Sequence, residues 1–151
     1  MKVMFVCTGN TCRSAMAKYL FEKIIKENNK ENIEVYSCGI YAQTGDCATY
    51  NAIEVLKKYG IDMTSHRAIN INESNIKDMD LILCATISHK QIILNMYPDL
   101  IGKTYTIKEF AEDNIEGKEL DINDPWGYNN DTYLRCAEEI KNSLDKIIEK
   151  I

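Results

Sequence analysis

Apolar and polar positions follow two different periods along the first forty residues. Residues 2–7, KVMFVC, form a short apolar run with no helical gap, which is typical of a strand covered on both faces. From residue 14 onward, apolar side chains recur at the three- and four-residue spacing of an amphipathic helix. A polar turn at 28–32 then leads into a second predicted strand at 33–39. This order predicts a βαβ unit.

The remainder of the chain continues the same alternation. The pattern predicts, in order, a helix at 47–59, a strand at 80–85, a helix at 88–97, a short strand at 103–107 and a long helix at 131–151. Alternating strands and helices predict an α/β fold, namely a three-layer, doubly wound, four-stranded parallel sheet with helices on both faces. No repeat or linker interrupts residues 1–151, so we expect a single domain.

Composition narrows the class of protein. The chain has 151 residues, of which 45% are hydrophobic and 27% charged, as in an ordinary globular domain. The apolar N-terminal run is too short for a signal sequence, and no segment could span a membrane, so we expect a cytoplasmic protein. A net charge of -5 argues against nucleic acid or an anionic membrane as the main partner. A monomer or weak dimer is expected.

The six cysteines are expected to be free thiols, because the chain lacks an export signal and has a core of its own. No C-x2-C pair occurs, and the two histidines, His66 and His89, are far apart in sequence. The usual ligand spacing of a structural zinc site is therefore missing. We expect neither a metal nor a cofactor.

The most informative motif follows the first predicted strand, where ligands bind in doubly wound sheets. It is a C-x5-R-S loop with the sequence Cys7, Thr8, Gly9, Asn10, Thr11, Cys12, Arg13 and Ser14. Five residues between cysteine and arginine can curl so that their backbone N–H groups converge on one anion. The positive end of the following helix dipole adds to this attraction. The loop therefore predicts a phosphate site.

The side chains of this loop suit nucleophilic catalysis. The field that binds phosphate also favours the reactive thiolate of Cys7. Arg13 can offer two parallel N–H donors to phosphate oxygens, in the ground state and in the transition state. Ser14 can cap the helix or donate its hydroxyl to the Cys7 sulfur, and Asn10 tolerates left-handed backbone angles. The alternative is a structural cysteine followed by helix-capping residues, and the strand–loop–helix context argues against it.

Such a nucleophile needs a proton donor for the leaving group and a base for the attacking water. One carboxylic acid can serve both steps. Asp124 is the candidate, because Pro125 stiffens its loop and Trp126 can shield it from water and wall the pocket. Taken alone, Asp-Pro is more often the start of a turn.

Together, CTGNTCRS near the N-terminus and DPWG late in the chain resemble the low-molecular-weight protein-tyrosine phosphatase family over essentially the full length. The resemblance implies a four-stranded parallel α/β sheet, with Cys7 as nucleophile, Arg13 as phosphate ligand and Asp124 as acid and then base. It also implies a supporting hydrogen-bond network of Asn10, Ser14 and Ser37. The chain departs from the family pattern at Ala15 and Lys18, outside the cradle, and at Trp126-Gly127, which looks like the bacterial branch.

Thr11 bears on the substrate, which we expect to be a phosphorylated protein. In this family the position is usually a bulky aliphatic residue in tyrosine-specific members, whereas the protein-arginine phosphatases resemble this chain in having threonine. Its hydroxyl can contact a polar guanidinium or position the attacking water. Phosphoarginine is therefore favoured over phosphotyrosine, with Tyr41 and Trp126 expected at the pocket rim.

Two further residues carry open alternatives. Cys12 is expected to lie close enough to Cys7 for a disulfide that switches activity off reversibly, as the resemblance supports, or else to be a small packed residue. His66 either orients the loop asparagine or is a structural histidine. His89 and the other cysteines are expected to be structural or solvent-facing.

Two rival functions share the loop. A thiol-dependent arsenate reductase needs a second pair of redox cysteines, which is not evident, because no cysteine lies between Cys84 and Cys136. A non-catalytic anion-binding module would not depend on the Cys7 thiol.

Overall fold

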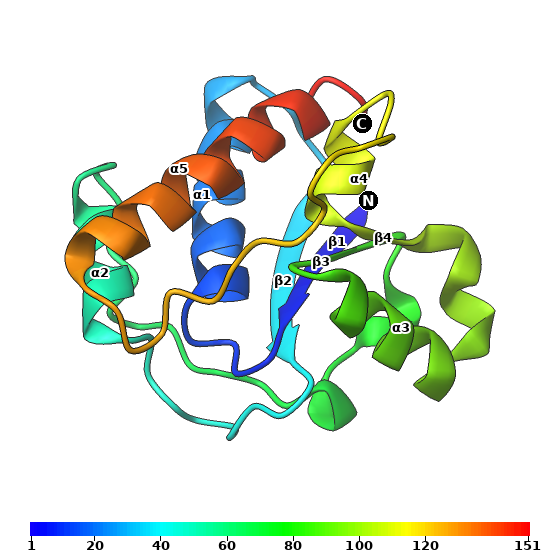
Figure 1. Cartoon of the computed structure of the whole chain (residues 1–151), viewed down its shortest axis with the longest axis horizontal. Coiled ribbons are helices and arrows are strands. Elements are labelled where there is room, and N and C mark those ends of the chain that lie inside the picture. Colours follow the sequence, from blue (N-terminus) through cyan, green and yellow to red (C-terminus); the bar gives the residue numbers. More distant parts are fainter.

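A four-stranded parallel sheet forms the centre of the molecule (Figure 1), and the computed structural model describes all 151 residues. The strands lie in the order β2-β1-β3-β4. Their bounds are β1 (Lys2–Cys7), β2 (Glu34–Gly39), β3 (Leu81–Cys84) and β4 (Thr104–Thr106). The predicted doubly wound, parallel α/β sheet is confirmed.

Helices cover both faces of this sheet. They are α1 (Arg13–Glu27), α2 (Tyr50–Lys57), α3 (Ile87–Met96), α4 (Ile107–Ala111) and α5 (Asn130–Ile147), with 3-10 turns at Ile71–Glu73, Ile76–Asp78 and Pro98–Lys103. Helices α1, α2 and α5 lie on one side of the sheet and α3 lies on the other (Figure 1). None of the helices is long and apolar enough to cross a membrane.

Alternate residues of β1 point into two separate cores. Val3 and Phe5 belong to the larger core, under α1, α2, α4 and α5. Met4 and Val6 belong to the smaller core, which α3 and the 3-10 turns cover. Because both faces of β1 are buried, apolar side chains are favoured at successive positions and not only at every second one. This explains the continuous apolar run.

The helix bounds differ from the sequence prediction where a side chain caps the end. The helix predicted at 47–59 begins only at Tyr50, because Thr49 is its N-cap and accepts a hydrogen bond from the Ala52 N–H at 3.4 Å. Residue Cys47 instead forms a β-bridge with Arg67. The chain leaves the helix through Gly60, whose φ of 75° is the left-handed angle common after helix ends.

Two helices of the C-terminal third also differ from prediction. The helix predicted at 131–151 begins one residue earlier and ends at Ile147, with Asn129 as its N-cap. The short α4 was not predicted. It begins with a capping box, in which Thr106 and Glu109 each accept the other's backbone N–H.

Candidate active site

Residues 7–14, the phosphate loop, connect the end of β1 to the start of α1 at the carboxyl edge of the sheet (Figure 1). Asn10 adopts a left-handed φ of 56° inside this loop. The end of β2 approaches it closely: a Cβ on Gly39 would lie 2.6 Å from the Thr8 carbonyl oxygen and 2.9 Å from the Asn10 nitrogen. Only glycine fits between β2 and the phosphate loop without a backbone shift.

The Cys7 thiol is buried at the centre of this loop. Its sulfur lies 2.9 Å from Ser14 Oγ and accepts the Asn10 backbone N–H at 3.3 Å. Ser14 Oγ accepts a hydrogen bond from Asn10 Nδ2 at 2.8 Å, and its single hydrogen has two acceptors within reach, the Cys7 sulfur at 2.9 Å and the Cys38 backbone oxygen at 3.4 Å. Both contacts come from within the loop, so Asn10 and Ser14 hold the sulfur in place.

Asn10 is held from outside the loop by the segment 66–69. Its backbone oxygen lies 2.7 Å from His66 Nε2, and its side-chain oxygen accepts the Ile69 N–H at 3.0 Å. A carbonyl oxygen only accepts, so His66 Nε2 must carry the proton. Burial lowers the pKa of His66 and keeps the ring neutral. The histidine thus supports the strained asparagine through a neutral hydrogen bond.

Arg13 is almost completely buried, with 4% of its surface exposed. Its Nη1 donates to the Ile122 backbone oxygen at 2.9 Å, and its Nη2 lies 3.7 Å from Asp124 Oδ2. Its Nε is buried and has no hydrogen-bond partner. A buried N–H group without a hydrogen-bond partner costs free energy. A bound anion that accepts from Arg13 Nε would remove this cost.

Asp124, distant in sequence, is brought beside the phosphate loop. Its Oδ1 accepts from the Cys12 thiol at 3.6 Å and from the Trp126 backbone N–H at 3.1 Å. The predicted shielding by Trp126 is not seen: the indole is 66% exposed and the Asp124 side chain 50% exposed. Asp124 therefore lies next to Arg13 and Cys12 but remains open to solvent.

Cys12 has a different environment from Cys7. Burial, reinforced by the nearby Cys7 and Asp124, raises the pKa of its thiol. Cys12 is therefore a protonated donor to Asp124 at neutral pH, and Cys7 is the cysteine suited to nucleophilic attack.

Backbone hydrogen bonds hold Tyr41 and Thr11, two of the residues predicted for the substrate pocket. Tyr41 is 74% exposed, and its backbone N–H donates to the Thr8 carbonyl oxygen at 2.9 Å, which holds its backbone against the loop. The Thr11 backbone oxygen accepts the Thr49 N–H at 3.0 Å, so this hydrogen bond does not involve the Thr11 hydroxyl.

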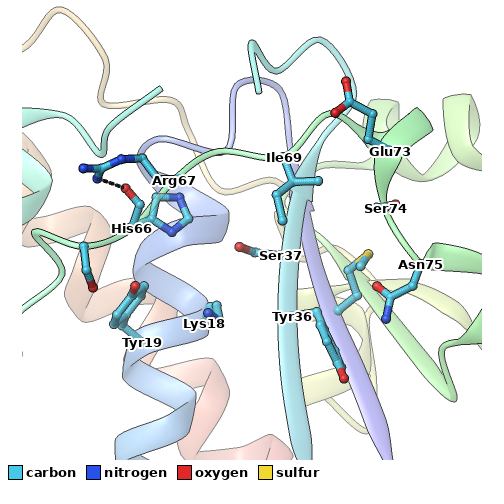
Figure 2. Close-up of a pocket in the computed structure, with 12 residues that line it drawn as sticks. Lys18, Tyr19, Tyr36, Ser37, His66, Arg67, Ile69, Glu73, Ser74 and Asn75 are labelled. Atoms are coloured by element: carbon cyan, nitrogen blue, oxygen red, sulfur yellow. Dashed lines mark hydrogen bonds between the residues drawn. The ribbon is translucent and has the colours of Figure 1, made fainter. Parts of the chain in front are cut away.

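Ser37 lies elsewhere. It lines a cavity of about 410 Å³ between α1, β2 and residues 65–75, together with Tyr19, Tyr36 and His66. Figure 2 shows Ser37 projecting from β2 toward the side where His66 and Lys18 lie. It makes no hydrogen bond to the phosphate loop. The contribution of β2 is instead the backbone oxygen of Cys38, 3.4 Å from Ser14 Oγ.

Comparison with known proteins agrees with this geometry. The family model for low molecular weight phosphotyrosine protein phosphatase matches residues 2–151. The chain belongs to this family. A protein-arginine-phosphatase of Geobacillus stearothermophilus is 36% identical over 152 residues, covering 99% of this chain and 95% of the relative.

Two solved structures have the same fold. A low molecular weight protein tyrosine phosphatase from T. tengcongensis is 43% identical, with a TM-score of 0.91 over 100% of this chain and 99% of the other. A YwlE arginine phosphatase mutant with a phosphorylated active site serine is 33% identical, with a TM-score of 0.90 over 99% and 95% of the two chains. The chain is thus a protein phosphatase of the low-molecular-weight family.

Three contacts of this phosphatase were not predicted from its sequence. His89 is buried, not solvent-facing, and its Nε2 lies 2.8 Å from Thr8 Oγ1. Gly39 allows the close approach of β2, and the Ile122 carbonyl oxygen binds Arg13. Of these contacts, only the one at Gly39 had a signal in the sequence, namely a glycine at the end of a predicted strand. A contact made by a backbone carbonyl gives no signal in the sequence, because every residue has one.

Cys84 and Cys136 do not resemble a second redox pair. Cys84 is fully buried in β3, and burial raises the pKa of its thiol. Cys136 is also buried, which raises the pKa of its thiol to about 12. Buried thiols of this kind react slowly in disulfide exchange. This geometry disfavours the arsenate reductase alternative.

Proposed function

We propose that this phosphatase hydrolyses phosphorylated protein side chains through a cysteinyl-phosphate on Cys7, with phosphoarginine as the favoured substrate. The proposal rests on the surroundings of Cys7 and Arg13. The Cys7 sulfur sits between the Ser14 hydroxyl and the Asn10 N–H, while the buried Nε of Arg13 has no partner. A nucleophile and an unused anion donor within one loop support phosphoryl transfer better than a structural role.

In the first step, the Cys7 thiolate attacks the phosphorus and forms the S–P bond. The bond from phosphorus to the leaving nitrogen or oxygen breaks, and its electron pair goes to that atom, which takes a proton from Asp124. Arg13 and the backbone N–H groups of the loop stabilise the charge on the three equatorial oxygens. Asp124 ends this step as a carboxylate.

In the second step, a water attacks the phosphorus and gives its proton to Asp124. The S–P bond breaks, and the electron pair returns to Cys7 as a thiolate. The Ser14 hydroxyl, 2.9 Å from that sulfur, stabilises the departing thiolate. Inorganic phosphate leaves, and Asp124 is again protonated for the next substrate.

Two features support the phosphoarginine preference. Thr11 offers a hydroxyl where an aliphatic residue would pack on an aromatic ring. Asp124, whose side chain is half-exposed, can protonate the leaving nitrogen and then pair, as a carboxylate, with the positively charged guanidinium that forms. The relative from Geobacillus stearothermophilus is named an arginine phosphatase, whereas the structure from T. tengcongensis is named a tyrosine phosphatase. Phosphotyrosine is therefore the second candidate.

The covalent step is tested by rapid quench. Mixing the protein with a phosphorylated peptide should trap phosphate on Cys7, and mass spectrometry should locate it on the peptide that contains residue 7. The Cys7→Ser variant should lose turnover by at least about 10⁴-fold. Asp124→Ala should prolong the trapped species, because water attack then lacks its base. If no phosphate can be trapped on Cys7 while turnover continues, the mechanism is wrong.

The substrate preference is tested with matched peptides that carry phosphoarginine or phosphotyrosine at the same position. The parent protein should favour phosphoarginine in kcat/KM, and Thr11→Ile should shift the ratio toward phosphotyrosine. Thr49→Ser, a change outside the phosphate loop, is the control and should leave the ratio of the two kcat/KM values unchanged. Equal ratios in the parent and in Thr11→Ile would contradict the role given to Thr11.

We also propose reversible inactivation through a disulfide between Cys7 and Cys12. An oxidant such as peroxide would convert the Cys7 thiolate to a sulfenic acid, which the Cys12 sulfur attacks with release of water. Because the Cys12 thiol is protonated, this closure should accelerate as pH rises. In Cys12→Ser, prolonged exposure to peroxide should oxidise the Cys7 sulfenic acid further to a sulfinic acid, so thiol reductant should then restore activity to the parent but not to this variant. The cytoplasmic location and the monomeric or weakly dimeric state stay predictions from the sequence.

A further inference from the structure

The first turn of α3 contacts both loops of the proposed site. His89 reaches the phosphate loop, where its Nε2 lies 2.8 Å from Thr8 Oγ1. The backbone N–H of Ile87 reaches residues 121–127, the acid loop, and donates to Asp121 Oδ1 at 2.8 Å. Because one helical turn holds both contacts, it fixes the two loops relative to each other.

The contact with the phosphate loop is rigid on the helix side. The Nδ1 atom of His89 lies 2.9 Å from Thr86 Oγ1, and the same hydroxyl accepts the His89 backbone N–H at 3.1 Å as the N-cap of α3. The ring is 6% exposed, and burial together with the charge of Arg13 lowers its pKa to about 4. A neutral ring therefore holds the Thr8 hydroxyl and adds no charge beside the phosphate cradle.

The contact with the acid loop uses the exposed N–H groups at the start of a helix. The Asp121 carboxylate satisfies one of them at the positive end of the α3 dipole. The next residue is bonded on both sides: the Ile122 N–H donates to the Ala85 oxygen at 2.9 Å, and its oxygen accepts from Arg13. Asp124 follows two residues later. Its position therefore depends on how firmly Asp121 and Ile122 are held.

Resting on the proposed phosphatase function, we propose that the first turn of α3 is a clamp that positions the general acid over the phosphate loop. His89 holds Thr8, and Asp121 holds the acid loop so that Asp124 faces the leaving group. Neither residue touches the reacting atoms, so both are positioning residues. A misplacement of about 1 Å between a proton donor and its acceptor can cost up to about 100-fold in rate.

The acid-loop arm is tested by leaving-group dependence. Phenyl phosphate needs proton donation to its leaving oxygen, whereas p-nitrophenyl phosphate leaves as a stable phenolate. We expect Asp121→Ala to lower kcat/KM about tenfold for phenyl phosphate and less than about twofold for p-nitrophenyl phosphate. Asp121→Asn, which keeps an oxygen acceptor for the Ile87 N–H, should restore most of the loss. Equal losses on both substrates would overturn the proposal.

A double variant separates positioning from general destabilisation. In the Asp124→Ala background the acid is absent, so Asp121→Ala should cause no further loss on phenyl phosphate. A loss that is fully additive would overturn the proposal. Glu116→Ala is the matched control, because this exposed carboxylate lies in the same connection between α4 and α5 and binds no other side chain. It should cause no loss in either background.

The phosphate-loop arm is tested by product inhibition. His89→Ala should raise the inhibition constant of inorganic phosphate about tenfold, equally with both substrates, because the cradle is loosened and the acid is not. His89→Gln, whose amide can form a hydrogen bond with the Thr8 hydroxyl in place of Nε2, should restore it. An unchanged constant in His89→Ala, or failure of His89→Gln to restore it, would overturn the proposal.

Failure of the clamp and failure of the proposed function give different results. If the proposed function fails, Asp124→Ala itself turns over phenyl phosphate at the parent rate. If only the clamp fails, Asp124→Ala is slow and Asp121→Ala matches the parent.

Discussion

The phosphate loop and the acid loop meet at Arg13 but are held in different ways. In the phosphate loop, most residues are buried, and Cys7, Asn10 and Ser14 bind one another directly. In the acid loop, the carboxylate of Asp124 is half-exposed and Trp126 is 66% exposed. One loop is fixed by many short contacts, and the other is attached at a few points.

This difference matches what each loop has to do in the proposed mechanism. A cradle for phosphate must be preorganised, because donors already in place cost no reorganisation as charge develops. The acid must reach the leaving group in one step and a water in the next, so it benefits from fewer contacts.

Arg13→Lys should nearly abolish activity. Lysine lacks the planar fork that binds two phosphate oxygens, and it cannot at the same time donate to the Ile122 oxygen that ties the acid loop. We expect kcat/KM to fall at least about 10³-fold, measured with a phosphorylated peptide. Arg135→Lys, on the exposed side of α5, is the control and should match the parent. A loss below tenfold would contradict the shared role of Arg13 in the two loops.

Gly39→Ala should displace the backbone of the phosphate loop where β2 packs against it. The added Cβ would lie 2.6 Å from the Thr8 oxygen, which is backbone and cannot swing aside. We expect the free energy of unfolding, measured by urea denaturation, to fall by about 1–3 kcal/mol, with a loss of phosphatase activity. Gly102→Ala has no atom within 4 Å of its added Cβ and is the matched control. Equal stability of the two variants would show that the loop is not rigidly packed.

The phosphate loop should also make stability depend on pH through His89. Its pKa falls from 6.5 in the unfolded chain to about 4 in the folded protein, because the ring is buried and near Arg13. The unfolded chain therefore binds more protons between these values, and stability is lost as pH falls from 6.5 toward 4. From pH 7 to pH 5 this loss is about 2 kcal/mol.

Urea denaturation at pH 7 and pH 5 measures this loss. His89→Gln keeps a hydrogen-bonding side chain without the titration, so its stability should fall by about 2 kcal/mol less than that of the parent. His66, whose pKa is also lowered, still contributes in both proteins. Identical pH dependence in the two proteins would exclude a buried neutral His89.

Trp126→Ala should have the smallest effect on stability. Because the indole is 66% exposed, its removal should change the free energy of unfolding by less than about 0.5 kcal/mol. Any functional effect should appear in the KM for a phosphorylated peptide, as expected of a residue at the pocket rim. A stability loss above 1 kcal/mol would show that the acid loop is packed more firmly than its exposure indicates.

The fold and the phosphate loop could be predicted because their signals are local. The unbroken apolar run at 2–7 indicated a buried parallel strand, and β1 has the same bounds. The C-x5-R-S motif lies within eight consecutive residues, so the meeting of Cys7 with Ser14 follows from a single strand–loop–helix turn. Asp124 needed the family resemblance as well, since Asp-Pro by itself is only a turn signal.

The sequence by itself therefore determined the α/β architecture, the family and the position of the Cys7–Ser14 loop. Only the tertiary structure decided which distant groups hold that loop: His89 from α3, Gly39 from β2 and the Ile122 carbonyl from the acid loop. It also directed Ser37 into a separate cavity and left Trp126 exposed. The physical reason is that such contacts depend on how strands and loops pack, and several are made by backbone carbonyl and N–H groups, which every residue carries and no motif reveals.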